Sequence, residues 1–197
     1  MRIARHSCLF ALVVFSALAA SAQSRPIDSV GSKLIVHASK SGLFSGFADN
    51  HEIEAPIAEG SIDDSASRVN FVIESRAMKV LDPQTSVDRR RQIQDRMLSP
   101  EVLDVQRFPK IIFESSKVEK TASGEFLVQG QLSLHGVTRP VSIKVRNEGG
   151  RYLGECTIKQ RDYSIEPISI VGGTVKVKDE LKIDFEIRTM AQSAERK

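Results

Sequence analysis

The sequence has few of the residues from which disulfides, metal sites and covalent catalysts are usually built. It contains two cysteines, four histidines and no tryptophan among its 197 residues. Only Cys156 lies beyond residue 22, so no disulfide can form within the rest of the chain. The fold must therefore depend on a hydrophobic core.

Long apolar runs are also missing, except at the N-terminus. Two arginines precede an apolar run from Cys8 to Ala20, and the small-x-small sequence at 20–22 has the form of a cleavage site. A membrane anchor would need about 18 or more apolar residues, and this run is shorter. The pattern predicts a secretory signal peptide at 1–22 and a single domain at 23–197, with no transmembrane segment after cleavage.

A strong net charge is the third absence. The formal charge of +3 falls to +1 when the signal peptide is removed, because two arginines and no acidic residue are lost with it. Nucleic-acid binding needs a concentrated basic surface. We therefore expect no nucleic-acid partner.

Alternation of apolar and polar residues is the dominant pattern that is present. In GQLSLHGVTRPVSIKV, at 130–145, two alternating limbs flank a His-Gly break, which is typical of two antiparallel strands with one wet face. Similar segments recur from residue 30 to the C-terminal region and make about eight strands in all. The sequence predicts an all-β antiparallel barrel or sandwich, because closure removes exposed edges.

The interval 86–108 breaks this alternation. Ser86 can cap a helix that runs through about Leu98, and Ser99 can cap a second helical segment with Pro100 at its first position. We predict a short helical insertion between strands 3 and 4. Such an insertion commonly covers one end of a barrel.

Large and very small residues are mixed on the predicted inner faces. An eight-stranded barrel is about wide enough to be filled by its own side chains or to hold one small ligand. Gly130 and Gly154 at central inward positions favour a ligand cavity, and a bend or bulge is the alternative role for each glycine. We predict that the cavity wall contains Val36, Phe71, Ile73, Phe113, Phe126, Val128, Gly130, Leu132, Ile143, Gly154, Ile158, Ile183 and Phe185.

No arrangement of residues predicts catalysis. His37, His51 and His135 lack ligand-like spacing to another histidine or cysteine, and nucleophile elbows, phosphate loops and dinucleotide fingerprints are missing. Cys156 falls on an inward apolar position, where a thiol is inert. We expect no enzyme activity, no metal and no cofactor; a metal-dependent hydrolase, the rival hypothesis, would need the three histidines to converge.

A charged residue lies within the apolar face of the predicted helix. On a helical wheel of 86–100, Arg90 falls within that face, whereas Arg89 and Arg96 point away. A buried charge needs a partner. Arg90 therefore pairs with a carboxylate such as Asp104, extends to water, or contacts the polar end of a ligand at the mouth of the barrel.

Three segments resemble, in the same order, signature segments of the YceI-like family of exported bacterial lipid-binding proteins. They are RFPKIIFESSKV (107–118), GQLSLHGVTRPVSIKV (130–145) and VKVKDELKIDFEI (175–187), and the resemblance extends from about Ser32 to Arg188. It implies an extended eight-stranded antiparallel lipocalin-like barrel with a long apolar pocket for a polyisoprenoid chain, including quinone-type lipids.

The resemblance also implies a role for one helix residue and contains one departure. Arg90 lies where many members have an arginine before the helix, which agrees with a head-group contact. Many members carry an aromatic pair before the aspartate, where this chain has Val102 and Leu103 before Asp104. If that pair lines the entrance in other members, the chain length or head group accepted here differs.

The leading hypothesis is a periplasmic binding protein that sequesters or transports a polyisoprenoid, quinone-type or prenyl, in an apolar cavity. Its partner is then a long-chain isoprenoid lipid. The alternative is a non-catalytic structural or stress-related interaction module with a filled barrel.

Overall fold

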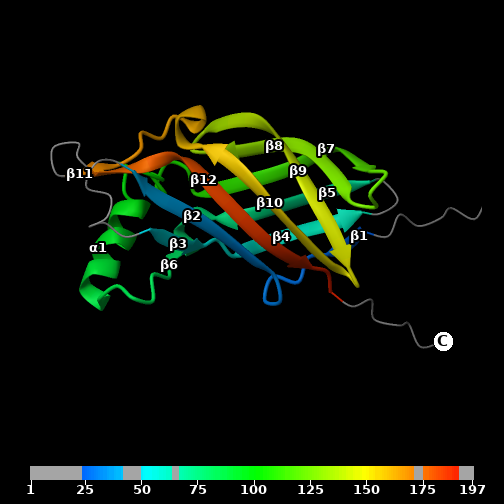
Figure 1. Ribbon diagram of the computed structural model, residues 1–197, viewed down its shortest axis with the longest axis horizontal. Coiled ribbons are helices and arrows are strands. Elements are labelled where there is room, and N and C mark those ends of the chain that lie inside the picture. The colour runs from blue at the N-terminus through cyan, green and yellow to red at the C-terminus, as the bar shows by residue number, and fades with distance from the viewer. Residues whose placement is uncertain (1–23, 42–49, 64–66, 171–174, 191–197) are drawn as a thin grey trace, which may run out of the picture.

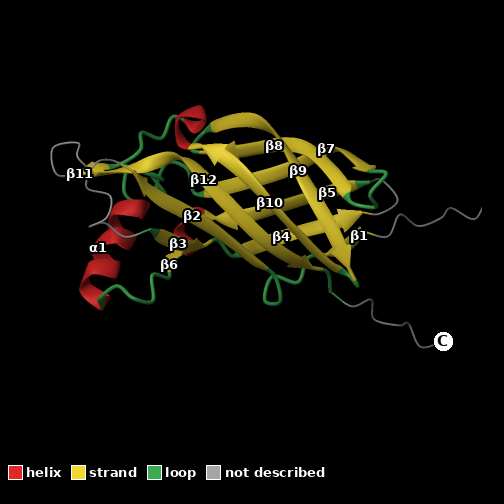
Figure 2. Cartoon of the chain, in the orientation of Figure 1, coloured by secondary structure: helices red, strands yellow, loops and turns green. Residues whose placement is uncertain are grey.

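The alternating segments form one antiparallel sheet that curls around its apolar face, with a helix at one end (Figure 1). The computed structural model describes residues 24–41, 50–63, 67–170 and 175–190. The predicted signal peptide at 1–22 lies outside the described residues. Figure 2 shows that strands make up most of the described chain.

Most strands follow one another along the chain with short connections, and the longer segment between residues 80 and 110 contains a helix. They are β1 (Ser24–Pro26), β2 (Lys33–Ser41), β3 (His51–Glu54), β4 (Ile57–Asp63), β5 (Arg68–Glu74), β6 (Lys79–Val80), β7 (Lys110–Lys120), β8 (Phe126–Leu134), β9 (Val137–Glu148), β10 (Arg151–Lys159), β11 (Ser169–Ile170) and β12 (Val175–Arg188). The helices are α1 (Val87–Leu98) and the 3₁₀ turns η2 (Ser75–Ala77) and η3 (Gln160–Tyr163).

The hydrogen-bonded order of the sheet is β1-β4-β5-β7-β8-β9-β10-β12-β2-β3-β6, and β11 pairs with β12. The predicted all-β antiparallel class is confirmed. The predicted number of eight strands is not confirmed, because the described residues form 12 strands. β1, β6 and β11 are two or three residues long, too short to show alternation, and Pro56 separates β3 from β4.

The two distant strands β1 and β12 meet where the described chain begins and ends. An isolated bridge joins Ile27 to Thr189. The amide of Met190 donates a hydrogen bond to the carbonyl oxygen of Pro26 at 2.9 Å. Because β1 also pairs with β4, these bonds curl the sheet back onto itself at this end.

The predicted His-Gly turn is a two-residue hairpin between β8 and β9. Leu134 pairs with Val137, and the two residues between them have positive φ angles, 51° at His135 and 76° at Gly136. Such a turn matches the twist of the strands it joins. A Cβ atom at Gly136 would lie 2.5 Å from the ring of Phe108, so only glycine fits there.

Helix α1 begins at the predicted cap, since the Ser86 hydroxyl accepts a hydrogen bond from the amide of Arg89. It lies between β6 and β7, so the predicted place between strands 3 and 4 is not confirmed. In the part of the chain that the structure describes, no helix is long and apolar enough to cross a bilayer.

The predicted second helix from Ser99 is wrong, because this segment forms turns. The amide of Leu103 donates to the carbonyl oxygen of Met97, and the amide of Val105 donates to that of Leu98. These amides therefore satisfy the free carbonyl groups at the end of α1, in place of building a new helix. Asp104 has a φ of 42°, which an α-helix does not allow.

The larger cluster of buried apolar side chains joins α1 and η3 to many of the strands. This core includes Ala55, Ile57, Met78, Val80, Met97, Leu103, Val105, Tyr163 and Ile165. A second group lies on β7, β8 and β9, and consists of Phe113, Val128, Ile143 and Val145.

Candidate functional site

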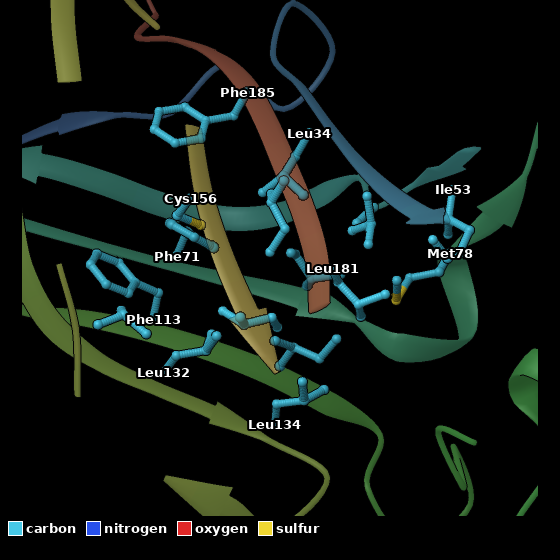
Figure 3. A pocket seen from close by; sticks show the side chains of 18 of the residues that line it. Leu34, Ile53, Phe71, Met78, Phe113, Leu132, Leu134, Cys156, Leu181 and Phe185 are labelled. Atoms are coloured by element: carbon cyan, nitrogen blue, oxygen red, sulfur yellow. The ribbon is translucent and has the colours of Figure 1, made fainter. Parts of the chain in front are cut away.

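The inner face of the curled sheet lines a cavity of about 940 Å³. Side chains from strands that are distant in the sequence point toward it, among them Leu34, Phe71, Phe113, Cys156 and Phe185 (Figure 3). Most of the lining is apolar because the inner face of each strand carries its apolar residues. A cavity of this size does not agree with the alternative hypothesis, an interaction module whose barrel is filled by its own side chains.

The apolar residues that alternation predicted to face inward all line this cavity. They are Val36, Phe71, Ile73, Phe113, Phe126, Val128, Leu132, Ile143, Ile158, Ile183 and Phe185. Phe71 and Phe113 stack, with ring centroids 5.2 Å apart. These residues come from seven strands, and the sheet register alone brings them together.

The two glycines predicted to leave room, Gly130 and Gly154, are not among the residues that line the cavity. A Cβ at Gly154 would lie 2.5 Å from Cζ of Phe185 and 2.6 Å from the carbonyl oxygen of Lys144. A Cβ at Gly130 would lie 2.7 Å from the ring of Phe113. Each glycine therefore accommodates a phenylalanine ring from the neighbouring strand, as glycines in sheets often do.

The bulge alternative applies to only one of the two glycines. β10 pairs through Gly154 with both neighbours and no register shift. Opposite Gly130, the register of β7 shifts between Ser115 and Lys117, which places a bulge in the facing strand.

Helix α1 closes one end of the cavity and is fixed by a side chain that sequence reasoning missed. Nε2 of Gln94 donates to the carbonyl oxygen of Met78 at 2.8 Å, and Oε1 of Gln94 accepts from the amide of Val80 at 2.7 Å. Gln94 thus satisfies the free edge of β6 as another strand would. A helical wheel contains no signal for this contact, because it weighs apolar residues only.

This attachment rotates α1 relative to the orientation that the helical wheel predicted. Nη1 of Arg90 donates to the carbonyl oxygen of Leu81 at 3.3 Å, beside the bonds of Gln94. Arg89 and Arg96, predicted to point away, line the cavity. Val87, in the first turn of α1, is 66% exposed.

The two cavity-lining arginines of α1 differ in their surroundings. Nε of Arg96 donates to Oε2 of Glu101 at 2.8 Å. This bond raises the pKa of Arg96 and lowers the pKa of Glu101. The guanidinium of Arg89 has no such partner among residues 24–41, 50–63, 67–170 and 175–190. Val102 and Leu103, the departure from the family pattern, also line the cavity.

The three histidines lie in three separate environments. Nε2 of His37 is 2.8 Å from Oδ2 of Asp184, and Nδ1 of His135 is 3.2 Å from the carbonyl oxygen of Tyr163. His51 lines the cavity. Within the described ranges, no three His, Cys, Asp or Glu side chains are grouped so that they could hold a metal ion.

Cys156 lines the cavity as a protonated thiol. Burial, with the charge of Asp184 as a smaller cause, raises the pKa of Cys156 to about 11. The thiolate is the reactive form of cysteine. The thiol therefore acts as an apolar part of the wall at neutral pH.

Comparison with known proteins gives consistent matches over most of the chain. The model of the YceI-like domain family matches residues 27–189. A UPF0312 protein of Yersinia enterocolitica is 31% identical over 143 residues, which cover 70% of this chain and 68% of that protein. Protein YceI of Salmonella agona is 30% identical over 172 residues, which cover 79% and 83%.

A solved structure has a similar fold. The crystal structure of Burkholderia cenocepacia BcnA aligns with a TM-score of 0.62 at 16% sequence identity. The alignment covers 82% of this chain and 98% of that chain. At this level of identity the match concerns the fold alone.

Proposed function

The chain belongs to the YceI-like family, and from this premise we propose that it is a periplasmic binding protein that sequesters or carries a polyisoprenoid lipid without changing it chemically. The apolar cavity inside the curled sheet carries the proposal. In this view the long strands act as a lipocalin-like barrel around the lipid. The signal-peptide pattern at 1–22 supports export.

The size and lining of the cavity suit a lipid chain. Ligand sites in proteins usually measure about 300 to 1,000 Å³, and the cavity of about 940 Å³ is near the upper end. Aromatic and branched side chains from several strands surround it, which suits a methyl-branched chain. The few polar groups lie at the α1 end and beside the opposite turns.

Burial of the chain is sufficient to account for binding. Each buried CH₂-sized group stabilises the complex by about 0.8 kcal/mol, so a five-carbon unit contributes roughly 3 to 4 kcal/mol. Several units exceed an association cost of about 4 to 15 kcal/mol. A binding protein of this kind needs no dense polar constellation.

A chain-length series tests the proposal. Delipidated protein is titrated with prenols of two, three and four isoprene units and with longer homologues, by isothermal calorimetry. We expect the affinity to rise with each unit until the cavity is full and then to level off. Affinity that does not depend on chain length would contradict the proposal.

A cavity-filling variant and a matched surface variant make this test specific. Leu132→Trp adds side-chain volume inside the cavity. The affinity should therefore level off at a shorter isoprenoid chain than in the wild type. Lys144→Ala changes the outer face of β9 and should leave the whole series unchanged. Equal effects of the two variants would count against binding inside the cavity.

A further inference from the structure

His51 belongs to a row of residues that crosses four strands and faces the cavity. In the sheet register His51 pairs with Ala38, Ala38 pairs with Leu181, and Leu181 pairs with Ile158. Directly opposed residues in an antiparallel sheet share one face. All four residues line the cavity, and His51 is the polar member of the row.

A buried carboxylate holds the ring of His51. Nδ1 of His51 lies 2.6 Å from Oδ2 of Asp82, whose side chain is 2% exposed. The other oxygen of Asp82 accepts a hydrogen bond from the amide of Glu52 at 2.9 Å. An ionised carboxylate only accepts hydrogen bonds, so the proton lies on Nδ1 of His51.

This arrangement determines what the neutral ring offers to the cavity. A neutral imidazole carries one proton, and the hydrogen bond made by one nitrogen fixes the state of the other. With the proton on Nδ1, Nε2 of His51 is an acceptor. Nε2 has no hydrogen-bond partner in the described part of the chain.

A second polar side chain that lines the cavity also offers a hydrogen-bond acceptor. Gln160 lines the cavity and is buried, and its Nε2 donates to the carbonyl oxygen of Lys178 at 2.8 Å. The side-chain oxygen Oε1 of Gln160 is thus available to accept a hydrogen bond from a ligand. A ligand that displaces water from these groups must supply a hydrogen, since an unpaired buried acceptor weakens binding.

We propose that Nε2 of His51 accepts a hydrogen bond from a hydroxyl group on the head of the bound lipid, so that the protein prefers isoprenoid alcohols, phenols and quinols to the corresponding ethers and quinones. The inference rests on the proposed function and specifies its ligand. An ether or a quinone carries acceptors only and leaves Nε2 unpaired.

The test uses two ligands with one chain. Geranylgeraniol and geranylgeranyl methyl ether are titrated into delipidated protein in the same buffer. We expect the alcohol to bind about tenfold more tightly than the ether. A second pair, a prenylated quinol and its quinone, separates phenolic from aliphatic hydroxyl groups, and the quinol is expected to bind more tightly.

Two variants separate recognition from a structural role. In Asp82→Asn the amide oxygen still accepts from Glu52, while the amide nitrogen donates to Nδ1 and moves the ring proton to Nε2. The ether should then approach the affinity of the alcohol. His51→Phe removes the acceptor and should abolish the preference without lowering ether affinity. Circular dichroism checks the fold of both variants.

The outcomes distinguish a failure of the proposed role of His51 from a failure of lipid binding itself. If wild-type protein binds alcohol and ether equally, the cavity still binds lipid but the role of His51 is overturned. If Asp82→Asn keeps the full preference for the alcohol, the role of His51 is also overturned. If neither ligand binds at any concentration, the proposed function fails and this inference fails with it. The wild-type comparison decides alone if a variant does not fold.

Discussion

The lining of the cavity consists of two regions that are built in different ways. We call the first the apolar wall; its central residues are Phe71, Phe113, Val128, Ile143 and Phe185. We call the second the helix end; its polar residues include His51, Arg89, Gln92, Arg96 and Gln160. The strand register alone orients the wall, whereas side-chain hydrogen bonds between distant segments orient the helix end.

The difference separates two tasks of a lipid-binding site. The wall offers large apolar area with little direction, so it supplies affinity for a chain. The helix end offers a few directed polar groups, so it supplies selection of a head group. Changes in the wall should therefore alter stability and affinity strongly, and changes at the helix end should alter specificity or local order.

The largest effect is expected for Phe113→Ala in the wall. Phe113 is 2% exposed, stacks on Phe71 and covers Gly130. We expect the free energy of unfolding to fall by about 3 to 5 kcal/mol, the usual range for such truncations. Urea denaturation measures this, with Lys144→Ala as a control that changes it by less than about 0.5 kcal/mol.

A smaller loss is expected for Gly154→Ala. The added methyl group overlaps the ring of Phe185 and the carbonyl oxygen of Lys144, and overpacking of this kind costs about 1 to 3 kcal/mol. The double variant with Phe185→Leu should regain part of the loss, because only the carbonyl contact remains. If Gly154→Ala is as stable as the wild type, the close packing described for this glycine is incorrect.

At the helix end, Gln94→Ala should cost about 1 kcal/mol. Two hydrogen bonds to the edge of β6 are lost, and water can replace them in part. Hydrogen exchange at the amide of Val80 should become faster. Asp95→Ala, at the exposed neighbouring position, is the control and should leave that exchange rate unchanged.

The last prediction concerns the reactivity of Cys156 and involves no change in stability. With a pKa of about 11, about 0.1% of the thiol is ionised at pH 8. Labelling by iodoacetamide should therefore be roughly a hundredfold slower than labelling of an exposed cysteine, whose pKa is about 8.5. Bound lipid should slow it further, and a rate that lipid does not change would place the ligand away from Cys156.

The wall could be predicted from the sequence because alternation is a local property. Phe71, Val128 and Ile183 face inward because each lies on the apolar side of its own strand, and the prediction needs no partner. The glycines could not be assigned in the same way. The ring that occupies the space beside Gly154 comes from Phe185 on another strand, and only the register brings the two together.

The helix end could not be predicted because its orientation depends on tertiary contacts. The wheel placed Arg90 on the apolar face of the helix, but the two hydrogen bonds of Gln94 to β6 set the rotation of α1. His51 and Asp82 are 31 residues apart, and neither carries a local signal of the pairing.

Lipid extraction from protein isolated from its native source tests the central claim most directly. The protein is purified from the periplasmic fraction without detergent, extracted with organic solvent and analysed by mass spectrometry, with a Leu132→Trp sample as a matched control. The account predicts an isoprenoid with a hydroxyl-bearing head in wild-type protein and less of it, or a shorter chain, in the variant. Repeated absence of any lipid, together with no binding of added isoprenoids, would contradict it.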